Sequence, residues 1–178
     1  MKLICLDIET TGFNFTEDDI LQMSIIDGEG NKLFDEYFSP VHRDRWEEAE
    51  AVNHISPSMV AGKPKLTEFI PTIKAIIEAA DLIVGYNQVG FDCPFIEAAT
   101  GISFEGKKMV DVMLDFAPIY GEWNDYYGDY KWKSLSVCAS YYGYDFVPHN
   151  SLNDTLATLH CYYAMQKQEG SENTAESE

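Results

Sequence analysis

Two acidic side chains, Asp7 and Glu9, lie at the end of an apolar segment near the start of the chain. Residues 2–8 are predicted to form a buried strand, and residues two apart on a strand point to the same face of a sheet. Like charges held side by side destabilise a fold unless a cation neutralises them or solvent reaches them freely. The pair therefore indicates a cation site or, alternatively, two solvated acids at the end of a strand.

The next residues, Thr10, Thr11 and Gly12, favour the cation site. They predict a tight turn that carries hydroxyl groups and backbone amides beside the acidic pair. Such a turn can receive a terminal nucleotide and its phosphate.

Two further aspartates lie where helices are predicted to begin. Asp92 follows the short buried segment 82–85 and comes immediately before a helix expected over residues 94–99. By itself Asp92 is interpreted as a helix cap, because a carboxylate at a helix start stabilises the free amides of the first turn. Asp154 lies in the first turn of the last predicted helix, and with Ser151 it has the spacing of a capping box. Each motif alone thus has an explanation that involves no chemistry.

A histidine, His149, precedes Asp154 by five residues. On one continuous helix these two side chains would point about 140° apart. Their convergence therefore requires His149 to lie in a loop, which the neighbouring Pro148 favours. An imidazole titrates near neutrality and can accept a proton from water, so His149 is a candidate general base.

Together, the three segments resemble the three exonuclease motifs of the DEDDh family. The motifs are Asp-x-Glu-Thr-Thr-Gly from Asp7, Asn-x-x-x-Phe-Asp-x-x-Phe from Asn87 and His-x-x-x-x-Asp from His149. That family includes proofreading subunits of bacterial replicative polymerases, ribonuclease T and oligoribonuclease. The resemblance covers roughly residues 2–165, although many members carry glycine at the position of His54. It implies a ribonuclease H-like α/β fold, with a mixed central sheet flanked by helices, and 3′→5′ exonuclease activity that releases nucleoside 5′-monophosphates from DNA or RNA.

The resemblance also implies a role for each catalytic residue. Two divalent cations, Mg²⁺ or Mn²⁺, would be bound by the four carboxylates of Asp7, Glu9, Asp92 and Asp154. Asp7 would bridge both cations, and Glu9 and Asp154 would complete the site of the attacking water. Asp92 would serve the second cation through ordered water, and His149 would be the general base.

Substrate contacts are implied for the turn after the first motif and for the start of the second. The expected substrate-binding residues are Thr10, Thr11, Gly12, Phe13, Asn87 and Phe91. Core packing explains Phe91 equally well. The implied partners are single-stranded 3′ ends of DNA or RNA. The alternative is an accessory or binding module of the same fold that needs a polymerase or another protein partner, but retention of all five chemical positions argues against a module that never cleaves.

The elements that must position these residues follow from hydrophobic spacing and turn signals. Strands are predicted over residues 2–8, 20–27, 32–38 and 82–85, and helices over 46–53, 66–80, 94–99, 111–117, 134–142 and 151–166. Residues 120–132 are too rich in glycine for a helix and are expected to form an extended loop. Their aromatic side chains could stack on single-stranded bases, cover the core or contact a partner protein.

Composition and charge narrow the class of protein. The 178 residues predict one domain, 1–167, followed by an acidic tail, 168–178, that is expected to be disordered. Thirty acidic against 12 basic residues give a net charge of −18, which argues against long-range attraction to duplex and favours short or single-stranded ends. The absence of a long apolar stretch or signal peptide predicts a soluble cytoplasmic protein without membrane contact. The four scattered cysteines are predicted to be reduced core thiols.

Overall fold

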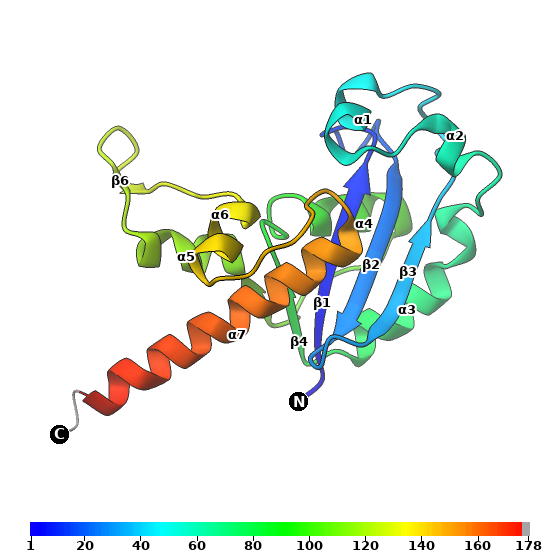
Figure 1. The fold of residues 1–178 in the computed structure, drawn as a ribbon. Helices are drawn as coiled ribbons and strands as arrows, with labels where there is room; N and C mark the ends of the chain where they lie inside the picture. The colour runs from blue at the N-terminus through cyan, green and yellow to red at the C-terminus, as the bar shows by residue number, and fades with distance from the viewer. Residues whose placement is uncertain (176–178) are drawn as a thin grey trace.

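The central sheet has five strands in the order β3-β2-β1-β4-β5 (Figure 1). The computed structural model describes the backbone of residues 1–175 and the side chains of residues 1–168. The strands are β1 Leu3–Thr10, β2 Ile20–Asp27, β3 Lys32–Tyr37, β4 Leu82–Gly85 and β5 Met109–Asp111. β1 pairs antiparallel with β2 and parallel with β4, so the predicted mixed sheet is confirmed. Strand β5 was not predicted, because three residues carry too little periodic signal.

The helices cover both faces of this sheet (Figure 1). They are α1 Glu47–Asn53, α2 Pro57–Val60, α3 Ile70–Ala79, α4 Asp92–Thr100, α5 Val112–Tyr120, α6 Leu135–Tyr141 and α7 Ser151–Ala175. The helix predicted over residues 66–80 is divided into a 3₁₀ turn, η1 Leu66–Glu68, and α3. The division lies next to Pro71, whose lack of an N–H group suits the first turn of a helix.

Alternate residues of β1 pack into two separate cores. Ile4, Leu6 and Ile8 lie in the cluster that α3 and α4 cover. Leu3 and Cys5 lie in the cluster on the other face, with residues of α5, α6 and α7. Because side chains alternate along a strand, Asp7 and Glu9 continue the row of Leu3 and Cys5. The fold thus directs both carboxylates toward the side of the sheet that α7 covers.

The last helix is longer than predicted. α7 ends at Ala175, beyond the predicted end at Gln166, so the expected tail, 168–178, begins within this helix. Residues 176–178 and the side chains of residues 169–178 lie outside the described residues, and the division into domain and tail stays a prediction. Within the described part of the chain, no helix is both long and apolar enough to cross a membrane. The cytoplasmic location also stays a prediction.

The segment 120–132 forms a short hairpin, which corrects the expectation of an extended loop. Its strands are β6 Trp123–Asn124 and β7 Asp129–Tyr130. The turn is closed by Gly128, whose φ of 66° lies in the left-handed region that glycine adopts readily.

All four cysteines are buried and free, as expected of core thiols.

Candidate active site

The first two acidic residues are placed by the sheet, and Asp92 reaches them from a helix. β1 pairs with β4 only through Leu3–Cys5, so the backbone after Cys5 has no strand partner on that side. Asp92 occupies this edge, and its Oδ1 accepts a hydrogen bond from the Ile8 amide at 3.0 Å. Its interpretation as a helix cap was wrong, because Phe91 is the N-cap of α4 and Asp92 is the first helical residue. The side chain of Asp92 therefore joins α4 to β1 at the acidic pair.

Asp154 and His149 meet at the start of α7. One oxygen of Asp154, Oδ2, accepts a hydrogen bond from the His149 amide at 3.1 Å. His149 lies in a loop, as predicted, with φ of 66° and an exposed side chain. The other oxygen, Asp154 Oδ1, is buried without a hydrogen-bond partner among the described residues. A buried carboxylate oxygen that accepts no hydrogen bond is suited to contact a cation or an ordered water.

The capping-box interpretation of Ser151 and Asp154 is also wrong. The Ser151 hydroxyl forms a 2.6 Å hydrogen bond with the Ser24 hydroxyl of β2 and does not cap α7. The Asn150 side chain instead accepts a hydrogen bond from the Asn153 amide at 3.3 Å. Asp154 is thus free to face the acidic site.

Side chains from two of the motifs converge closely. Glu9, His149 and Asp154 each offer a ligand atom, and these atoms lie within 4.8 Å of one another. Asp7 and Asp92 lie close enough to this group for charges within the cluster to raise the pKa values of Asp7 and Glu9. Residues separated by more than 140 positions in the sequence therefore form one site, which β1 and α7 bring together.

All four carboxylates have raised pKa values. Burial raises the pKa of Asp7 well above its ordinary value, and the charges of Asp92, Asp154 and Glu9 raise it further. Burial, followed by the charges of Asp154 and Asp92, raises the pKa of Glu9 to about 8. Burial raises the pKa of Asp92 and of Asp154 to about 7, although backbone N–H groups oppose the shift in each. The cluster therefore has an excess of negative charge that a positive ligand would relieve.

These residues fit a divalent cation. Carboxylate oxygens and one imidazole form a ligand set that hard cations accept, and the group whose ligand atoms lie within 4.8 Å of one another contains no cysteine. The partnerless Asp154 Oδ1 and the raised pKa values of the carboxylates both favour a bound cation at this cluster.

Comparison with known proteins agrees with this geometry. A family model described as an exonuclease, RNase_T, matches residues 4–162. The chain belongs to this exonuclease family. The DEDDh resemblance and the ribonuclease H-like fold are thereby confirmed, and the domain is placed among nucleases.

Individual relatives share the exonuclease domain within longer chains. DNA polymerase III of the PolC type from Staphylococcus aureus is 25% identical over 169 residues, which cover 93% of this chain and 11% of the polymerase. The zinc-bound complex of E. coli exonuclease I with single-stranded DNA has a TM-score of 0.76 and 19% identity, over 95% of this chain and 41% of that one. Exonuclease I from Methylocaldum szegediense has a TM-score of 0.72 and 23% identity, over 95% and 41%. The similarity to the two exonuclease I structures shows the shared fold.

Asn53 supports the acidic pair of the exonuclease domain, and the sequence did not single it out. Its side-chain Nδ2 donates a hydrogen bond to the Thr10 carbonyl at 3.0 Å, and its Oδ1 accepts one from the Ile55 backbone amide at 3.0 Å. A hydrogen bond from Asn53 also opposes the rise in the pKa of Glu9. The next residue, His54, ends α1 with φ of 60°, a conformation that glycine adopts most easily. His54 therefore has a local structural role, because its backbone N–H closes α1 on the Glu50 carbonyl.

Gln22 holds the start of α7 against β2. Its side-chain oxygen accepts hydrogen bonds from the Ser151 amide and from the Asn150 side chain, both at 3.3 Å. Its amide group donates to Asp35 at 3.2 Å, and Gln22 is buried. Because Gln22 pairs with Glu9 in the sheet, this network fixes His149 and Asp154 relative to β1. A buried polar residue on β2 could have been suspected from the sequence, but its partners could not.

Asp111 shapes the second motif. Its carboxylate accepts hydrogen bonds from the Asn87 amide at 2.8 Å and from the Val89 amide at 3.2 Å, and it also caps α5. Asn87 has φ of 58° and an exposed side chain. The predicted substrate-binding residue Asn87 therefore lies on the surface in a conformation that Asp111 maintains.

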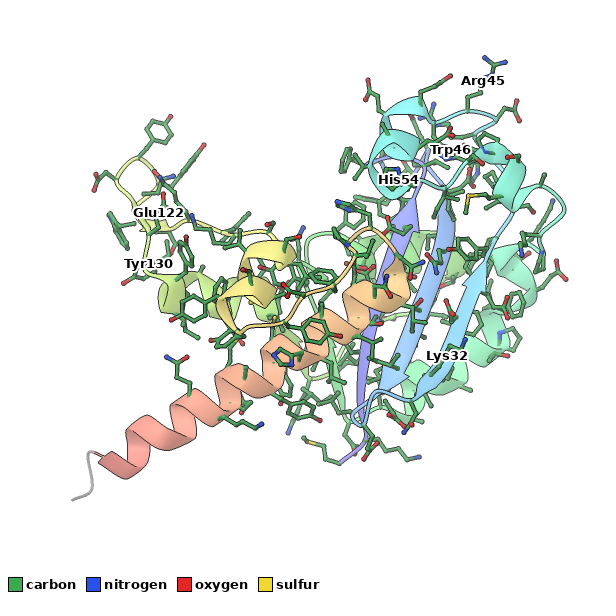
Figure 2. The ribbon with its side chains drawn as sticks, viewed as in Figure 1. Lys32, Arg45, Trp46, His54, Glu122 and Tyr130 are labelled. Carbon is green, nitrogen blue, oxygen red and sulfur yellow. The ribbon has the colours of Figure 1, made fainter. Side chains whose placement is uncertain are left out.

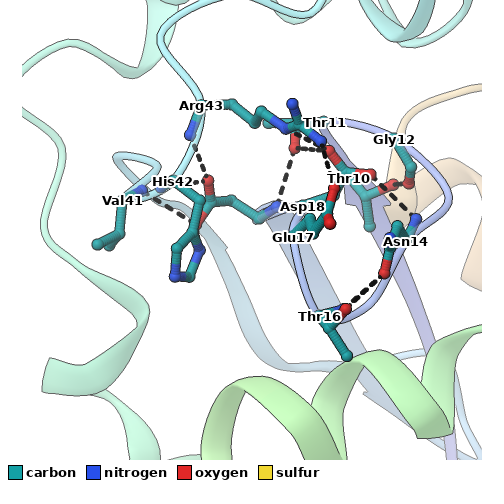
Figure 3. Close-up of polar contacts among 11 residues, drawn as sticks. Thr10, Thr11, Gly12, Asn14, Thr16, Glu17, Asp18, Val41, His42 and Arg43 are labelled. Carbon is teal, nitrogen blue, oxygen red and sulfur yellow. Dashed lines mark hydrogen bonds and ion pairs between the residues drawn. The ribbon is translucent and has the colours of Figure 1, made fainter.

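The turn after the first motif is held by a polar network (Figure 3). Thr10 donates to the Gly12 carbonyl at 2.6 Å, and Thr11 donates to Asp18 at 3.2 Å. Asp18 also bonds Arg43, and a Cβ atom at Gly12 would come within 2.4 Å of the Asp18 carboxylate. Both threonine hydroxyls thus serve the turn itself, and Gly12 is required by the close approach of Asp18.

Phe13 and Phe91 lie beside this turn. Phe13 is 89% exposed and meets the half-buried Phe91 edge to face, with 6.2 Å between ring centroids. Phe91 in turn packs on the buried Phe95 at 4.9 Å. The exposed ring of Phe13 is therefore available to a ligand, whereas Phe91 combines core packing with a partly open face.

Proposed function

We propose that this exonuclease domain removes nucleotides one at a time from the 3′ end of single-stranded DNA or RNA and releases nucleoside 5′-monophosphates. The observation that carries the proposal is the convergence of Asp7, Glu9, Asp92 and Asp154 with the exposed His149. The complexes of E. coli exonuclease I with single-stranded DNA support the choice of substrate.

We assign the four carboxylates as ligands of two divalent cations, Mg²⁺ or Mn²⁺. Two such cations would supply an activated water and would neutralise negative charge on the leaving oxygen. Glu9 and Asp154 are suited to the water side, because their ligand atoms lie within 4.8 Å of those of His149. Asp92 approaches from the other edge of β1, through the Ile8 amide, and suits the second cation. The charges of Asp92, Asp154 and Glu9 all raise the pKa of Asp7. Asp7 therefore suits a ligand that the two cations share.

The reaction forms one bond to phosphorus and breaks another. A water oxygen attacks the phosphorus that joins the last two nucleotides, and the bond from phosphorus to the 3′ oxygen of the penultimate nucleotide breaks. His149 accepts the proton that the water loses, because its side chain is exposed and lies beside Glu9 and Asp154. The released nucleotide keeps the phosphate on its 5′ oxygen, and the shortened strand keeps a 3′ hydroxyl after it gains a proton.

The substrate end would lie against the turn and the second motif. Phe13 is suited to stack on the terminal base, and the edge of Phe91 extends the same surface. The backbone of Thr10, Thr11 and Gly12 is suited to the terminal sugar and phosphate, because the two hydroxyls are already bonded within the turn. Asn87, which is exposed, is suited to the second nucleotide.

A digestion of end-labelled oligonucleotides tests the proposal. Single-stranded DNA and RNA, each labelled at either the 3′ or the 5′ end, would be incubated with purified protein and Mg²⁺ or Mn²⁺. The expected result is a ladder that shortens from the 3′ end, with 5′-monophosphates as products and no reaction in chelator. The Glu105→Gln variant, which alters an exposed carboxylate, should cleave like wild type. Shortening from the 5′ end, or internal cuts, would refute the proposal.

The similarity to PolC-type polymerase favours one alternative, an accessory domain that works with a polymerase. Strict dependence of cleavage on an added polymerase, with folded protein inactive alone, would favour that alternative.

A further inference from the structure

The β6–β7 hairpin presents aromatic rings to solvent. Tyr126 and Tyr127 at its tip are 86% and 77% exposed, and Trp132 and Trp123 are 63% and 50% exposed. Large aromatic side chains cost free energy when they are held in water, and clusters of them mark binding surfaces. The composition of the hairpin surface is therefore typical of a binding site.

The base of the hairpin is held in place. The Lys131 amide donates to the Glu122 carbonyl at 2.8 Å, and the side chains of Lys131 and Lys133 both pair with the Glu122 carboxylate. Lys133 also lies over the Tyr120 ring at 4.5 Å, and Trp123 meets Tyr130 edge to face at 5.2 Å. The exposed rings are thus carried by an ordered support, which limits the entropy lost when a ligand binds.

The hairpin is connected to the candidate active site. The Tyr86 hydroxyl donates to the Lys133 carbonyl at 2.8 Å, and the residue after Tyr86 is Asn87 of the second motif. Partly exposed rings continue from the hairpin to α6. The ring centroid of Tyr120, at the end of α5, lies 6.3 Å from that of Tyr141, at the end of α6. The loop that follows α6 leads to His149. An extended ligand could therefore contact the hairpin and the site together.

The other side of the site differs in chemistry. In Figures 1 and 2 α1 lies over the end of β1, whereas the hairpin stands apart from it, beyond α5 and α6. The first turn of α1 carries Glu47, Glu48 and Glu50, and its last turn has no basic residue. Residues 39–62 include one aromatic side chain, Trp46, which is buried. Charges of both signs occur on the α1 side, where Arg43 and Arg45 precede the three glutamates. The exposed aromatic rings therefore distinguish the two sides, because unpaired bases find stacking partners on the hairpin side.

We propose that the β6–β7 hairpin is the binding surface for the bases of single-stranded nucleic acid upstream of the 3′ end, with Tyr126, Tyr127 and Trp132 as the stacking residues. This inference rests on the proposed function and names where the rest of the strand lies. Stacking suits a chain of net charge −18, because base faces are uncharged and every base has one. It also tolerates any sequence, as removal of successive nucleotides requires.

The test compares substrates of two lengths. Tyr126→Ala/Tyr127→Ala and Trp132→Ala would be measured against Tyr126→Phe/Tyr127→Phe and Trp132→Phe, which keep the rings. On a strand of about 12 nucleotides, we expect the alanine variants to lose roughly tenfold in kcat/KM for each stacked ring, mainly through a higher KM. On a dinucleotide the same variants should stay within about twofold of wild type, because a dinucleotide bound at the site is too short to reach the hairpin. The phenylalanine variants should resemble wild type on both lengths.

Binding without cleavage separates this inference from the proposed function. In chelator, the strand of about 12 nucleotides should quench tryptophan emission, because stacked bases quench indole. Two of the three tryptophans, Trp123 and Trp132, lie in the hairpin, so Trp123→Phe/Trp132→Phe should abolish the quenching. Quenching by a protein that cleaves nothing would support the hairpin and refute the nuclease activity. Cleavage without quenching, or equal losses on both substrate lengths, would overturn the hairpin proposal and leave its rings to a protein partner.

Discussion

The acidic cluster and the aromatic hairpin are built in opposite ways. The cluster draws partly or fully buried carboxylates from β1, α4 and α7, far apart in the sequence, and they raise one another's pKa values. The hairpin is one continuous segment whose rings are exposed and contribute little to the core. The repelling carboxylates of the cluster therefore oppose folding, whereas the exposed rings of the hairpin are available to a ligand and contribute little to stability.

The largest effect is expected from Asp7→Asn in the acidic cluster. We expect cleavage to fall by roughly 10²–10³-fold or more, as when one contact to developing charge is removed. In chelator at about pH 8, the same variant should unfold at a temperature a few degrees higher than wild type, because one of the repelling carboxylates is gone. Initial rates and thermal unfolding measure the two effects. A variant that loses activity and stability together would contradict the account.

Gln22→Leu tests the support of the cluster. It leaves the Ser151 amide without its acceptor, at about 1–3 kcal/mol for a buried group left unpaired, while the Asn150 side chain keeps its hydrogen bond to Tyr37. Since the network positions His149 and Asp154, cleavage should also fall by roughly 10–100-fold, as for groups that orient metal ligands. Denaturant unfolding and kcat measure these effects. An unchanged kcat would show that the start of α7 is positioned by other contacts.

The stability of the protein should depend on pH through the carboxylates of the cluster. Glu9, Asp92 and Asp154 have folded pKa values of about 8, 7 and 7, above their ordinary values, so the folded state keeps protons that the unfolded state has lost. In chelator the melting temperature should therefore fall as pH rises from about 5 to about 8, by several degrees, since about 1 kcal/mol corresponds to roughly 2–4 °C here. Added Mg²⁺ or Mn²⁺ should remove most of this fall. A melting temperature that rises with pH in chelator would contradict the shifts.

The smallest effect is expected at the hairpin. Tyr126→Ala/Tyr127→Ala removes two exposed rings and should change the free energy of unfolding by less than about 0.5 kcal/mol. Chemical denaturation measures this directly. A larger loss would show that the hairpin helps to hold the fold, and the contrast with the cluster would fail.

The nuclease class and the fold could be predicted because the three motifs that carry the family resemblance depend on residue type and local spacing. The Asp7–Glu9 pair, the loop position of His149 and the first three strands all follow from period and turn signals. The capping interpretations of Asp92 and Ser151 failed, because the Ile8 amide and the Ser24 hydroxyl, their actual partners, come from distant strands.

The supporting residues could not be predicted for the same reason. Asn53, Gln22 and Asp111 act through hydrogen bonds to segments that only the folded sheet brings near. Strand β5 and the hairpin were missed as elements because two or three residues give no measurable period.

The most direct test of the central claim is the number of cations that the cluster binds. Titration of Mn²⁺ at about pH 7.5, followed by calorimetry in two buffers of different ionisation enthalpy, reports both stoichiometry and protons released. The account predicts two bound cations per chain in the wild type, protons released on binding, and weaker binding with fewer cations in Asp7→Asn. Absence of binding, or equal binding by the two proteins, would contradict it.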